Sequence, residues 1–436
     1  MRGLKRLIRS FMPAPLLSAY HFALSYLAAL QYRFPSRKIL VIGVTGTKGK
    51  SSVIEYLNAI FEAAGYKTAV ASTIRFKIAG LSEPNTKRMT MVGRLALQRL
   101  LADAVLNDCN VALVEMTSEG ARQHRHRFIE LDALVFLNLA PEHIESHGSL
   151  AAYKDAKFEL GRQLARSRKR PRFIAANADD REAARYLALP VEHPLPFSLS
   201  ALEKWHADER GGTFTFENEE MRIHLPGAFS VQNALAAATL TRALGIPLGA
   251  IKRGLDSLTR IPGRAERIEA APAPGRAAGR KQDFLVVVDY AHTPDSLKAL
   301  YDAYQSMRKI CVLGATGGGR DLWKRPVMGK LAAEACAHVI LTNEDPYDEE
   351  PRSIVEAMER GMQGGSHEIL MDRREAIRRA LSLARPGDAV LITGKGTDPS
   401  ICGPRGSDVP WSDAAVAREE LEKLLSAEGG AKAAVQ

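Results

Sequence analysis

Residues 39–51, ILVIGVTGTKGKS, constrain the fold of this chain more than any other stretch. They open with a β-branched apolar run at 39–42, which is typical of a buried parallel strand, and a helical pattern extends from Lys50 to Ala63. A strand, a glycine loop and a helix start in this order form a phosphate cradle, because backbone N–H groups and the positive end of the helix face the anion. We predict that Lys50 neutralises the phosphate and that the Ser51 hydroxyl reaches Mg²⁺.

The glycines of this stretch depart from the commonest phosphate-binding spacing, which would place a glycine where Val44 stands. The variant GxTGTxGK[ST] fits better, with its glycines at Gly43, Gly46 and Gly49. A tight glycine turn before a helix is the alternative interpretation. The Gly-Lys-Ser ending after a strand favours the phosphate cradle, because it is far more specific than an isolated GxGxxG.

The composition narrows the class of protein. A chain of 436 residues with 46% hydrophobic and 25% charged residues is expected to form two or three globular domains. The net charge of +10 suits anionic partners such as nucleotides, sugar phosphates or an acidic membrane surface, and it also serves solubility. We expect no nucleic-acid partner, because no basic motif is interleaved with aromatic residues. The absence of a CxxC pair argues against a zinc site and against a disulfide framework, and it fits a reducing cytosol. The cysteines are Cys109, Cys311, Cys336 and Cys402.

Residues 1–37 differ in character from the rest. Apolar residues with helical spacing over 4–11, separated by Arg and Lys, predict a basic amphipathic helix. Pro13 and Pro15 end it, and the almost wholly apolar stretch 16–30 would reach only about 22 Å as a helix, short of the roughly 30 Å hydrocarbon core. A signal peptide is disfavoured, because the predicted phosphate cradle follows directly and would need cytosolic ATP. Two interpretations stay open: the segment packs on its own domain or a second subunit, or it lies in a membrane interface with its arginines toward anionic head groups.

The pattern from 38 to 261 alternates strands with helices, which indicates an α/β domain with a mainly parallel, doubly wound sheet. Short antiparallel strands are expected over 203–225, with a turn at Gly211-Gly212, and an alanine-rich helix over 235–244. The strand candidates are 39–44, 68–73, 111–116, 133–138 and 172–177, and the clearest helices are 92–107 and 149–166.

A domain boundary is predicted near Pro262. Residues 262–436 are expected to form a second, Rossmann-like α/β domain, with strands at 284–289, 309–313, 338–342 and 389–393. Residues 271–281, APAPGRAAGRK, are typical of a mobile loop, and the tail after 426 is expected to fray.

Candidate metal ligands follow the central strands. Glu115 ends a buried strand, and the carboxyl ends of strands line the ligand crevice of such a sheet; the alternative is a helix cap or a loop carboxylate. His143 and His147 follow the next strand, and neutral histidine binds divalent cations, although clustered histidines are often only hydrogen-bonded loop residues. Lys157 lies further on, in a predicted helix.

At this point the chain resembles the Mur ligase family, the ATP-dependent amide-forming ligases of peptidoglycan precursor synthesis. GVTGTKGKS, VEMTSEG, NLAPEHIESHG and YKDAK are similar to the central ATPase domain of the family, in order. PGRAERI, VDYAHTPDSL, RDLWKRPVMG and ITGKG are similar to its C-terminal domain. The resemblance covers roughly nine-tenths of the chain, and VDYAHTPDSL and KRPVMG look most like the branch that adds the third amino acid to UDP-N-acetylmuramoyl-L-alanyl-D-glutamate.

The resemblance implies cofactors and roles. ATP would be bound with two Mg²⁺ ions, and the substrate carboxylate would become an acyl phosphate that an amine attacks. Lys157 matches the lysine that the family carbamylates. Ser51, Glu115, His143 and Lys157 would hold metal, and Lys50, Lys157, His143 and Glu115 would carry the catalysis. The implied ATP-binding residues are Thr45, Gly46, Thr47, Lys48, Gly49, Lys50, Ser51, Ser52, Asn233, Arg264, Tyr290, His292 and Asp295.

Several departures bear on the substrates. The N-terminal domain that grips UDP in this family has no counterpart, since only 1–37 precedes the first strand, so a lipid-linked acceptor or docking on another subunit is a hypothesis. Thr117-Ser118-Glu119 replaces the family's Ser-Ser-His. Arg125 belongs to a set of basic residues that either grips an anionic acceptor or forms a solvated face.

The amine-binding motifs also differ. Tyr347 stands where the diaminopimelate signature has an arginine, so the sequence favours lysine or another amine over diaminopimelate. Asp398 ends a GKGTD motif in place of the family's GKGHE and could recognise an ammonium group. The candidate substrate residues are Thr117, Ser118, Arg125, Asp345, Tyr347, Gly394 and Asp398.

The function expected from the sequence is an ATP-dependent ligase that adds an amino acid to a muramyl-peptide-type carboxylate, in the cytoplasm or at the inner face of the cell membrane. A ligase of the same superfamily acting on another or a lipid-linked acceptor is the nearest alternative. A membrane-associated, nucleotide-binding ATPase without ligase activity is the alternative from a different class.

Overall fold

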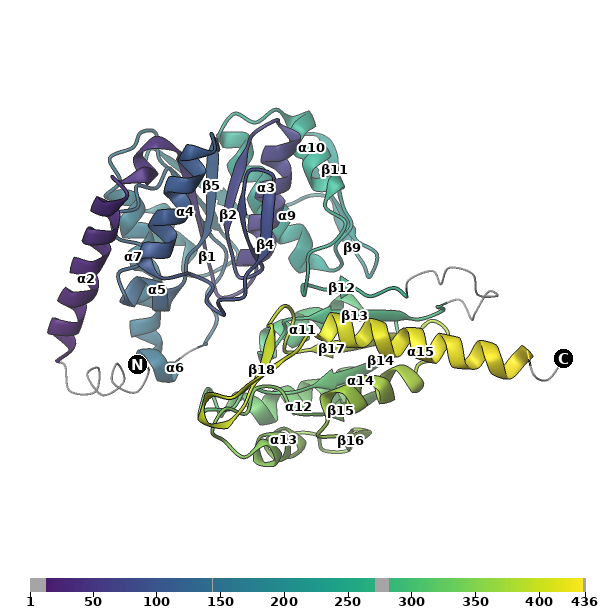
Figure 1. Cartoon of the computed structure of the whole chain (residues 1–436). Helices are drawn as coiled ribbons and strands as arrows, with labels where there is room; N and C mark the ends of the chain where they lie inside the picture. Colours follow the sequence, from purple (N-terminus) through teal and green to yellow (C-terminus); the bar gives the residue numbers. More distant parts are fainter. Residues whose placement is uncertain (1–12, 143, 271–281, 434–436) are drawn as a thin grey trace. The chain divides into compact units, whose positions relative to one another are not determined.

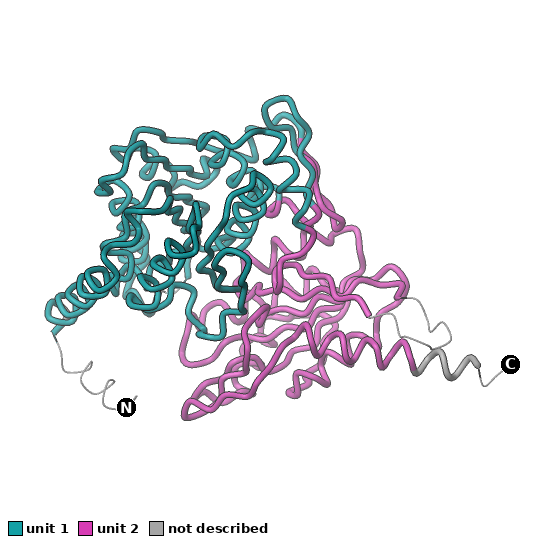
Figure 2. Tube along the Cα trace, turned by 45° about the horizontal axis from the view of Figure 1, so that its top comes forward, with its two compact units in different colours: residues 1–204, 214–223, 231–258 teal, residues 205–213, 224–230, 259–436 magenta. Residues whose placement is uncertain are grey.

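The computed structural model describes residues 13–142, 144–270 and 282–433. The basic amphipathic helix expected at 4–11, the loop expected at 271–281 and the candidate ligand His143 lie outside the described residues. The chain divides into two compact units, which Figure 2 shows in different colours. Unit 1 comprises Met1–Lys204, Phe214–Ile223 and Val231–Leu258, and unit 2 comprises Trp205–Thr213, His224–Ser230 and Thr259–Gln436.

Unit 1 is built on an eight-stranded sheet with the order β4-β3-β2-β5-β1-β6-β7-β8. The strands from β2 to β8 in this order run parallel, and β3 and β4 add an antiparallel edge. The prediction of a mainly parallel sheet is confirmed. The strands are β1 (Leu40–Thr45), β2 (Thr68–Ala71), β3 (Arg75–Ile78), β4 (Leu81–Pro84), β5 (Val111–Glu115), β6 (Ala133–Phe136), β7 (Phe173–Asn177) and β8 (His193–Phe197).

Helices connect these strands, as parallel crossovers require. The central strands read as continuous apolar runs because both of their faces are buried: Val41 and Ile42, on opposite faces of β1, are both fully buried. The helices are α3 (Lys50–Ala63), α4 (Arg94–Leu106), α5 (Ser118–Arg122), α6 (Ile144–His147), α7 (Leu150–Ala165), α8 (Ala183–Leu187), α9 (Ala228–Ala243) and α10 (Leu248–Ser257).

The apolar stretch after the first prolines forms helix α2 (Ala14–Gln31), with Pro13 at its N-cap and Pro15 in its first turn. It packs against α4 at the edge of unit 1 (Figure 1). Packing on its own domain, one of the two interpretations left open, is therefore observed for one side of this helix. Among the described residues, no helix is long and apolar enough to cross a membrane.

A three-stranded antiparallel sheet with the order β11-β10-β9 occupies the region in which short antiparallel strands were predicted. Its strands are β9 (Trp205–Ala207), β10 (Gly212–Phe216) and β11 (Glu219–Ile223). Gly211 lies in the first connection, as expected. The second turn is made by Glu217 and Asn218, both at positive φ, which the glycine pair did not reveal.

Unit 2 contains a six-stranded sheet with the order β12-β13-β17-β14-β15-β16. Only β12 is antiparallel. Alternate residues of one strand enter two separate cores, since Val287 packs on one face and Val286 on the other. The strands are β12 (Glu266–Arg267), β13 (Leu285–Asp289), β14 (Lys309–Leu313), β15 (His338–Leu341), β16 (His367–Ile369) and β17 (Ala389–Thr393).

The helices of unit 2 are α11 (Pro294–Ala303), α12 (Lys324–Ala335), α13 (Pro351–Glu359), α14 (Arg373–Ser382) and α15 (Asp413–Ala433), and a hairpin of β18 (Ser400–Cys402) and β19 (Asp408–Pro410) precedes α15. Helix α15 continues past residue 426, where the tail was expected to fray, as far as Ala433.

The expectation of no disulfide is wrong. Cys311 in β14 and Cys336 at the C-cap of α12 are joined by a disulfide. The crossover through α12 brings the chain back beside β14, where β15 begins. Two cysteines 25 residues apart in sequence thereby become neighbours. Spacing alone does not reveal this kind of pairing. Cys109 and Cys402 are free and buried.

Candidate functional site

The glycine loop of unit 1 runs from the end of β1 to the start of α3, as predicted. Gly49 is the N-cap of α3 and adopts φ 84°, a left-handed conformation that favours glycine. A Cβ at this position would lie 2.5 Å from the Asn233 side-chain oxygen. The loop therefore requires glycine here, and the predicted ATP contact Asn233 lies directly against it.

Two lysine side chains converge on one carbonyl of this loop. The Lys157 Nζ donates to the Gly46 carbonyl at 2.6 Å, and the Lys50 Nζ donates to the same carbonyl and to that of Thr47, both at 3.0 Å. Lys157 is buried, and this burial, reinforced by the nearby charge of Lys50, holds the pKa of its amine well below the usual lysine value. Lys157 comes from α7, far along the chain from the loop, so the fold brings together two lysines that the sequence placed in the site.

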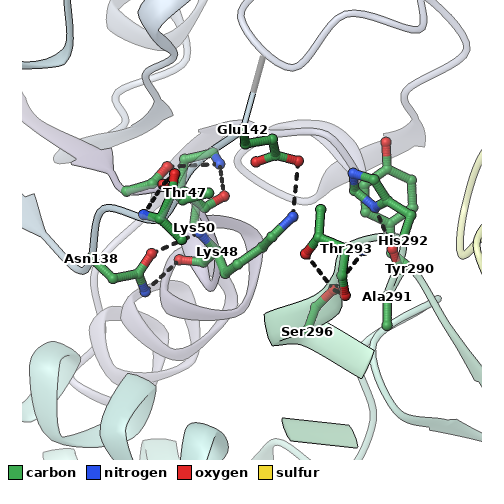
Figure 3. A network of polar contacts seen from close by, with 12 residues as sticks. Thr47, Lys48, Lys50, Asn138, Glu142, Tyr290, Ala291, His292, Thr293 and Ser296 are labelled. Atoms are coloured by element: carbon green, nitrogen blue, oxygen red, sulfur yellow. Dashed lines mark hydrogen bonds and ion pairs between the residues drawn. The ribbon is translucent and has the colours of Figure 1, made fainter. Parts of the chain in front are cut away.

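Lys48, the other lysine of the loop, is oriented differently (Figure 3). The Lys48 Nζ forms an ion pair with Glu142 at 2.9 Å, and its backbone N–H donates to the Asn138 side-chain oxygen at 2.9 Å. The Thr47 hydroxyl lies 3.0 Å from the Tyr153 hydroxyl. These contacts hold the loop against the segment after β6 and against α7. The sequence did not single out Asn138 or Tyr153 for this role.

Glu115 lies at the end of β5, beside the start of α3. Its side chain is fully buried, and it accepts hydrogen bonds from the Ser51 hydroxyl at 2.7 Å and from the Thr73 hydroxyl at 2.6 Å. The two oxygen ligands that the sequence assigned to Mg²⁺ are therefore adjacent. Thr73 was missed, because a threonine at a strand end carries no signal of its own.

The loop fits a polyphosphate. The Thr45 hydroxyl is buried and has no hydrogen-bond partner within the described ranges. No side chain caps the first turn of α3, so its backbone N–H groups are available to an anion. Lys50, whose Nζ lies at the same Gly46 carbonyl, supplies positive charge at this place.

The oxygen donors Ser51 and Glu115 suit Mg²⁺, which completes its shell with phosphate oxygens and water. In the part of the chain that the structure describes, no three His, Cys, Asp or Glu side chains form a metal-binding group. The predicted ligand His143 is not among the described residues.

The candidate acceptor residues are engaged in local structure. The Thr117 hydroxyl caps α5 by accepting from the Gly120 backbone at 3.0 Å, and the Ser118 hydroxyl lies 3.1 Å from the His147 ring. Arg125 donates to the Met91 carbonyl and, at 2.7 Å, to the Gln123 side chain. Ser52, the last of the predicted loop contacts, lies in the first turn of α3.

In unit 2, the predicted ATP-contacting residues form a cluster of their own after β13. The Arg264 guanidinium lies 4.6 Å from the centre of the Tyr290 ring, and the Tyr290 and His292 rings are 4.6 Å apart. Thr293 and Ser296 form a capping box at the start of α11, drawn in Figure 3, and Asp295 lies in the first turn of that helix. The fold thus brings Arg264, Tyr290 and His292 together.

The candidate amine residues of unit 2 surround a buried ion pair. Both carboxylate oxygens of Asp345 accept from the Lys395 Nζ at 2.8 Å, and the Cys402 backbone N–H donates to Asp345 at 2.7 Å. Asp398 lies 3.7 Å from the same ammonium. Lys395, which has no exposed surface, was not proposed from the sequence although it organises this region.

Tyr347 and Gly394 both have unusual backbones. Tyr347 has φ 53°, and burial raises the pKa of its hydroxyl to about 12. The Arg320 guanidinium lies 4.9 Å from the centre of its ring. Gly394 has φ 107°, and a Cβ there would lie 2.3 Å from the carboxylate of the buried Glu344. An arginine is therefore present beside Tyr347 in space, although none follows Pro346 in sequence.

Comparisons with known proteins cover most of the chain. The model of the Mur ligase middle domain matches residues 44–241, and that of the Mur ligase glutamate ligase domain matches residues 275–396. A UDP-N-acetylmuramoyl-L-alanyl-D-glutamate–2,6-diaminopimelate ligase of Halalkalibacterium halodurans is 34% identical over 86% of this chain and 76% of its own length. A UDP-N-acetylmuramyl-tripeptide synthetase of a Roseiflexus species is 35% identical over 92% and 82%.

Solved structures agree. A diaminopimelate ligase with 28% sequence identity matches 88% of this chain and 79% of its own with a TM-score of 0.59. MurF of Acinetobacter baumannii matches 92% of this chain and 80% of its own with a TM-score of 0.67 at 18% identity. Escherichia coli FolC, solved with ADP, matches 86% and 90% with a TM-score of 0.63 at 18% identity. The last two likenesses show the fold alone, and that fold is the predicted pair of α/β domains.

Proposed function

The chain belongs to the Mur ligase family of ATP-dependent, ADP-forming amide ligases, and from this premise we propose that it joins an amino acid to the carboxylate of a muramyl-peptide acceptor. One observation carries the proposal for this chain. Lys50 and Lys157 meet on the Gly46 carbonyl, beside a loop that has the features of a polyphosphate site. Curated relatives at 31–35% identity are named as enzymes that act on UDP-muramoyl peptides.

We assign the roles of the chain's residues as follows. Bound ATP supplies the phosphoryl group that activates the acceptor carboxylate, and Mg²⁺, of which we propose two ions, balances the charge of the phosphates. The loop N–H groups and Lys50 hold the phosphates in line with the acceptor. Ser51 and Glu115 hold a metal ion through oxygen, and Thr73 fixes the Glu115 carboxylate.

Lys157 is proposed to be carbamylated. A neutral lysine amine forms a C–N bond with the carbon of CO₂, one C=O electron pair moves to oxygen, and the amine releases a proton to water. The lysine thereby becomes a carboxylate that can bind a cation. Burial supports this assignment, because it lowers the pKa of the Lys157 amine and so favours the neutral form that reacts with CO₂.

For the amine, we propose lysine. The residue after Pro346 is Tyr347, so the chain has no arginine at the position where the sequence signature for diaminopimelate has one. Diaminopimelate is the second candidate, because the Arg320 guanidinium stacks near Tyr347 and could pair with a distal carboxylate. Arg320→Ala separates the two: it should raise the KM for diaminopimelate about tenfold and leave that for lysine unchanged if diaminopimelate is the substrate.

The test of the function is inorganic phosphate release in the presence of ATP and Mg²⁺, measured across a matrix of acceptors and amines. UDP-linked and lipid-linked muramyl peptides ending in D-glutamate are the acceptors, and lysine and diaminopimelate are the amines. Release should require one acceptor and one amine together, with a peptide product of matching mass. Turnover indifferent to every acceptor and amine would instead identify a non-ligase ATPase, and release with a different carboxylate would identify another acceptor.

A further inference from the structure

Helix α2 has the reverse of the usual polarity of a surface helix. Its polar residues Ser18, His21 and Ser25 face unit 1, where Ser25 is 1% exposed and His21 is 7% exposed. Its large apolar residues keep about half of their surface exposed, although Phe22 and Tyr26 also contact the Phe128 ring. These large apolar residues, which we call the outer face of α2, are Leu16, Tyr20, Phe22, Tyr26, Leu27 and Leu30, each between 44% and 60% exposed. A helix in contact with water on its outer side normally shows the opposite distribution.

Specific polar contacts fix this orientation. The Ser25 hydroxyl donates to the His124 carbonyl at 2.8 Å, and the Ser18 hydroxyl lies 2.7 Å from the His124 ring. The Arg94 guanidinium lies 2.9 Å from the His21 ring and donates to the Gln123 carbonyl at 2.9 Å. Rotation of α2 about its axis to hide the apolar residues would break these bonds. The exposure of the outer face is therefore built into the packing.

The apolar surface continues beyond the helix. A groove of about 640 Å³ runs between α2 and α4 and is lined by Leu24, Leu27, Ala28 and Leu95, with Arg94 and Arg99 also on its wall. Leu95 is 49% exposed. Contiguous exposed apolar patches of this kind mark interaction sites.

The charge of the surrounding sequence selects the partner. Residues 1–38 contain seven Lys or Arg residues and no Asp or Glu, and the first acidic residue of the chain is Glu55. A second copy of the chain would carry the same excess of positive charge, so like-charge repulsion opposes its docking on this face. An anionic surface with an apolar layer beneath it complements both features.

We propose that the outer face of α2, with the groove beside α4, docks on the surface of an anionic lipid bilayer. The helix would lie in the interface with its apolar residues among the acyl chains and the groove residues Arg94 and Arg99 at the head groups. It does not cross the bilayer, since no described helix can do so. This inference is independent of the proposed function: it concerns where the enzyme works, and it invokes none of the residues assigned to ATP or to the substrates.

The experiment is co-sedimentation of the full chain with vesicles of phosphatidylcholine alone or with 30 mol% phosphatidylglycerol. The protein should bind the anionic vesicles at least tenfold more tightly than the neutral ones, and high salt should weaken that binding. The triple variant Leu16→Ser, Tyr20→Ser, Leu27→Ser should lose binding at least tenfold. These residues are exposed, so the fold should persist, which circular dichroism and ligase activity on a soluble acceptor check.

The matched control changes three exposed apolar residues elsewhere, Leu81→Ser, Leu322→Ser and Val409→Ser, and should bind like the unchanged chain. Equal vesicle binding by the α2 triple variant and the unchanged chain would overturn the proposal, and so would no binding to anionic vesicles. A dimer in light scattering without vesicles that the α2 triple variant abolishes, together with absent vesicle binding, would assign the face to a second copy instead. Activity on the soluble acceptor reports on the proposed function separately.

Discussion

Two buried lysines, one in each unit, differ in the groups that their amines contact. In unit 1, Lys157 contacts the Gly46 carbonyl, and within the described residues no carboxylate lies at ion-pair distance from its ammonium. In unit 2, Lys395 is bound by both oxygens of Asp345, and Arg373 is bound by both oxygens of Asp413. The charge of a buried cation that has a carboxylate partner is balanced within the fold. Lys157, which is held by a carbonyl of the glycine loop, has no such partner in the described part of the chain and is the group for which we propose chemical modification.

The pKa shifts follow the same division. Burial lowers the pKa of Lys157, and the charge of Glu142, which acts to raise it, does not offset this effect. Burial also acts to lower the pKa of Arg373, but the charge and hydrogen bonds of Asp413 outweigh it and raise the pKa. A perturbed pKa in itself does not distinguish a structural from a functional group, whereas the partner does. Four measurements test this distinction, in order of decreasing expected effect.

The largest effect is expected for Lys157→Ala. Loss of the proposed carbamate should lower kcat for ligation about 10³-fold, since one group that stabilises charge in the reaction is removed. Acetate or another short carboxylic acid in the assay should restore part of the activity. Lys309→Ala is the matched control. Lys309 is also buried, and among the described residues it donates to two carbonyls, at 3.1 and 3.2 Å. It belongs to unit 2 and lies far from the glycine loop in sequence. Its kcat should stay within twofold, and full activity of Lys157→Ala would refute the assigned role.

The next effect is on stability. Asp413→Ala strands the Arg373 guanidinium, whose side chain is 1% exposed, and should lower the free energy of unfolding by about 3–5 kcal/mol. Urea denaturation measures this change. The double variant Arg373→Met, Asp413→Leu should recover most of it, because an apolar pair carries no desolvation cost. A loss below about 1 kcal/mol in the single variant would contradict the view that unit 2 pairs are structural.

A third test uses a buried group that, among the described residues, has neither a carboxylate nor a carbonyl as a hydrogen-bond partner. Both His126 ring nitrogens are buried without a hydrogen bond in the described ranges, and burial, with Arg127 adding, lowers the His126 pKa to about 3. The unfolded chain binds this proton near pH 6.5 and the folded chain does not, so the contribution of His126 is fully present above pH 6.5 and is lost as pH falls toward 3. About 3 kcal/mol should disappear between pH 6.5 and pH 4. Urea titrations of the unchanged chain and of His126→Phe should show the steeper acid loss only in the former.

The smallest effect is expected where charges stay in water. Lys298 and Asp302 form an i,i+4 pair at 2.6 Å on α11, with side chains 65% and 59% exposed. Lys298→Ala should change the free energy of unfolding by no more than about 0.5 kcal/mol. Thermal denaturation of this variant and of Asp413→Ala would show how strongly burial increases the contribution of an ion pair to the free energy of unfolding.

The sequence predicted much of the fold because its signals were local. The runs 309–313 and 389–393 became β14 and β17 without a change of boundary, and the other predicted strands shifted by one or two residues at their ends. Apolar runs between helical patterns determine a parallel sheet through burial alone. The turn at Glu217 and Asn218 was missed, since these residues reach positive φ without glycine.

The site was predictable as far as its residues belonged to motifs. Lys50, Ser51, Glu115 and Lys157 come together as expected, because the ends of parallel strands share one edge of the sheet. What escaped depended on contacts between distant segments. The pairing of Lys395 with Asp345, the disulfide of Cys311 and the support of Glu115 by Thr73 all join parts of the chain that no spacing rule connects.

The path of the backbone has a consequence for engineering. Residues 205–213 and 224–230 belong with 259–436, while 214–223 and 231–258 belong with the first two hundred residues. No single cut therefore yields two self-contained halves, and a gene fragment ending at 261 would carry pieces of both. Chimaeras that exchange substrate preference between relatives should place their crossovers before 205 or after 258, and import the intervening stretch whole.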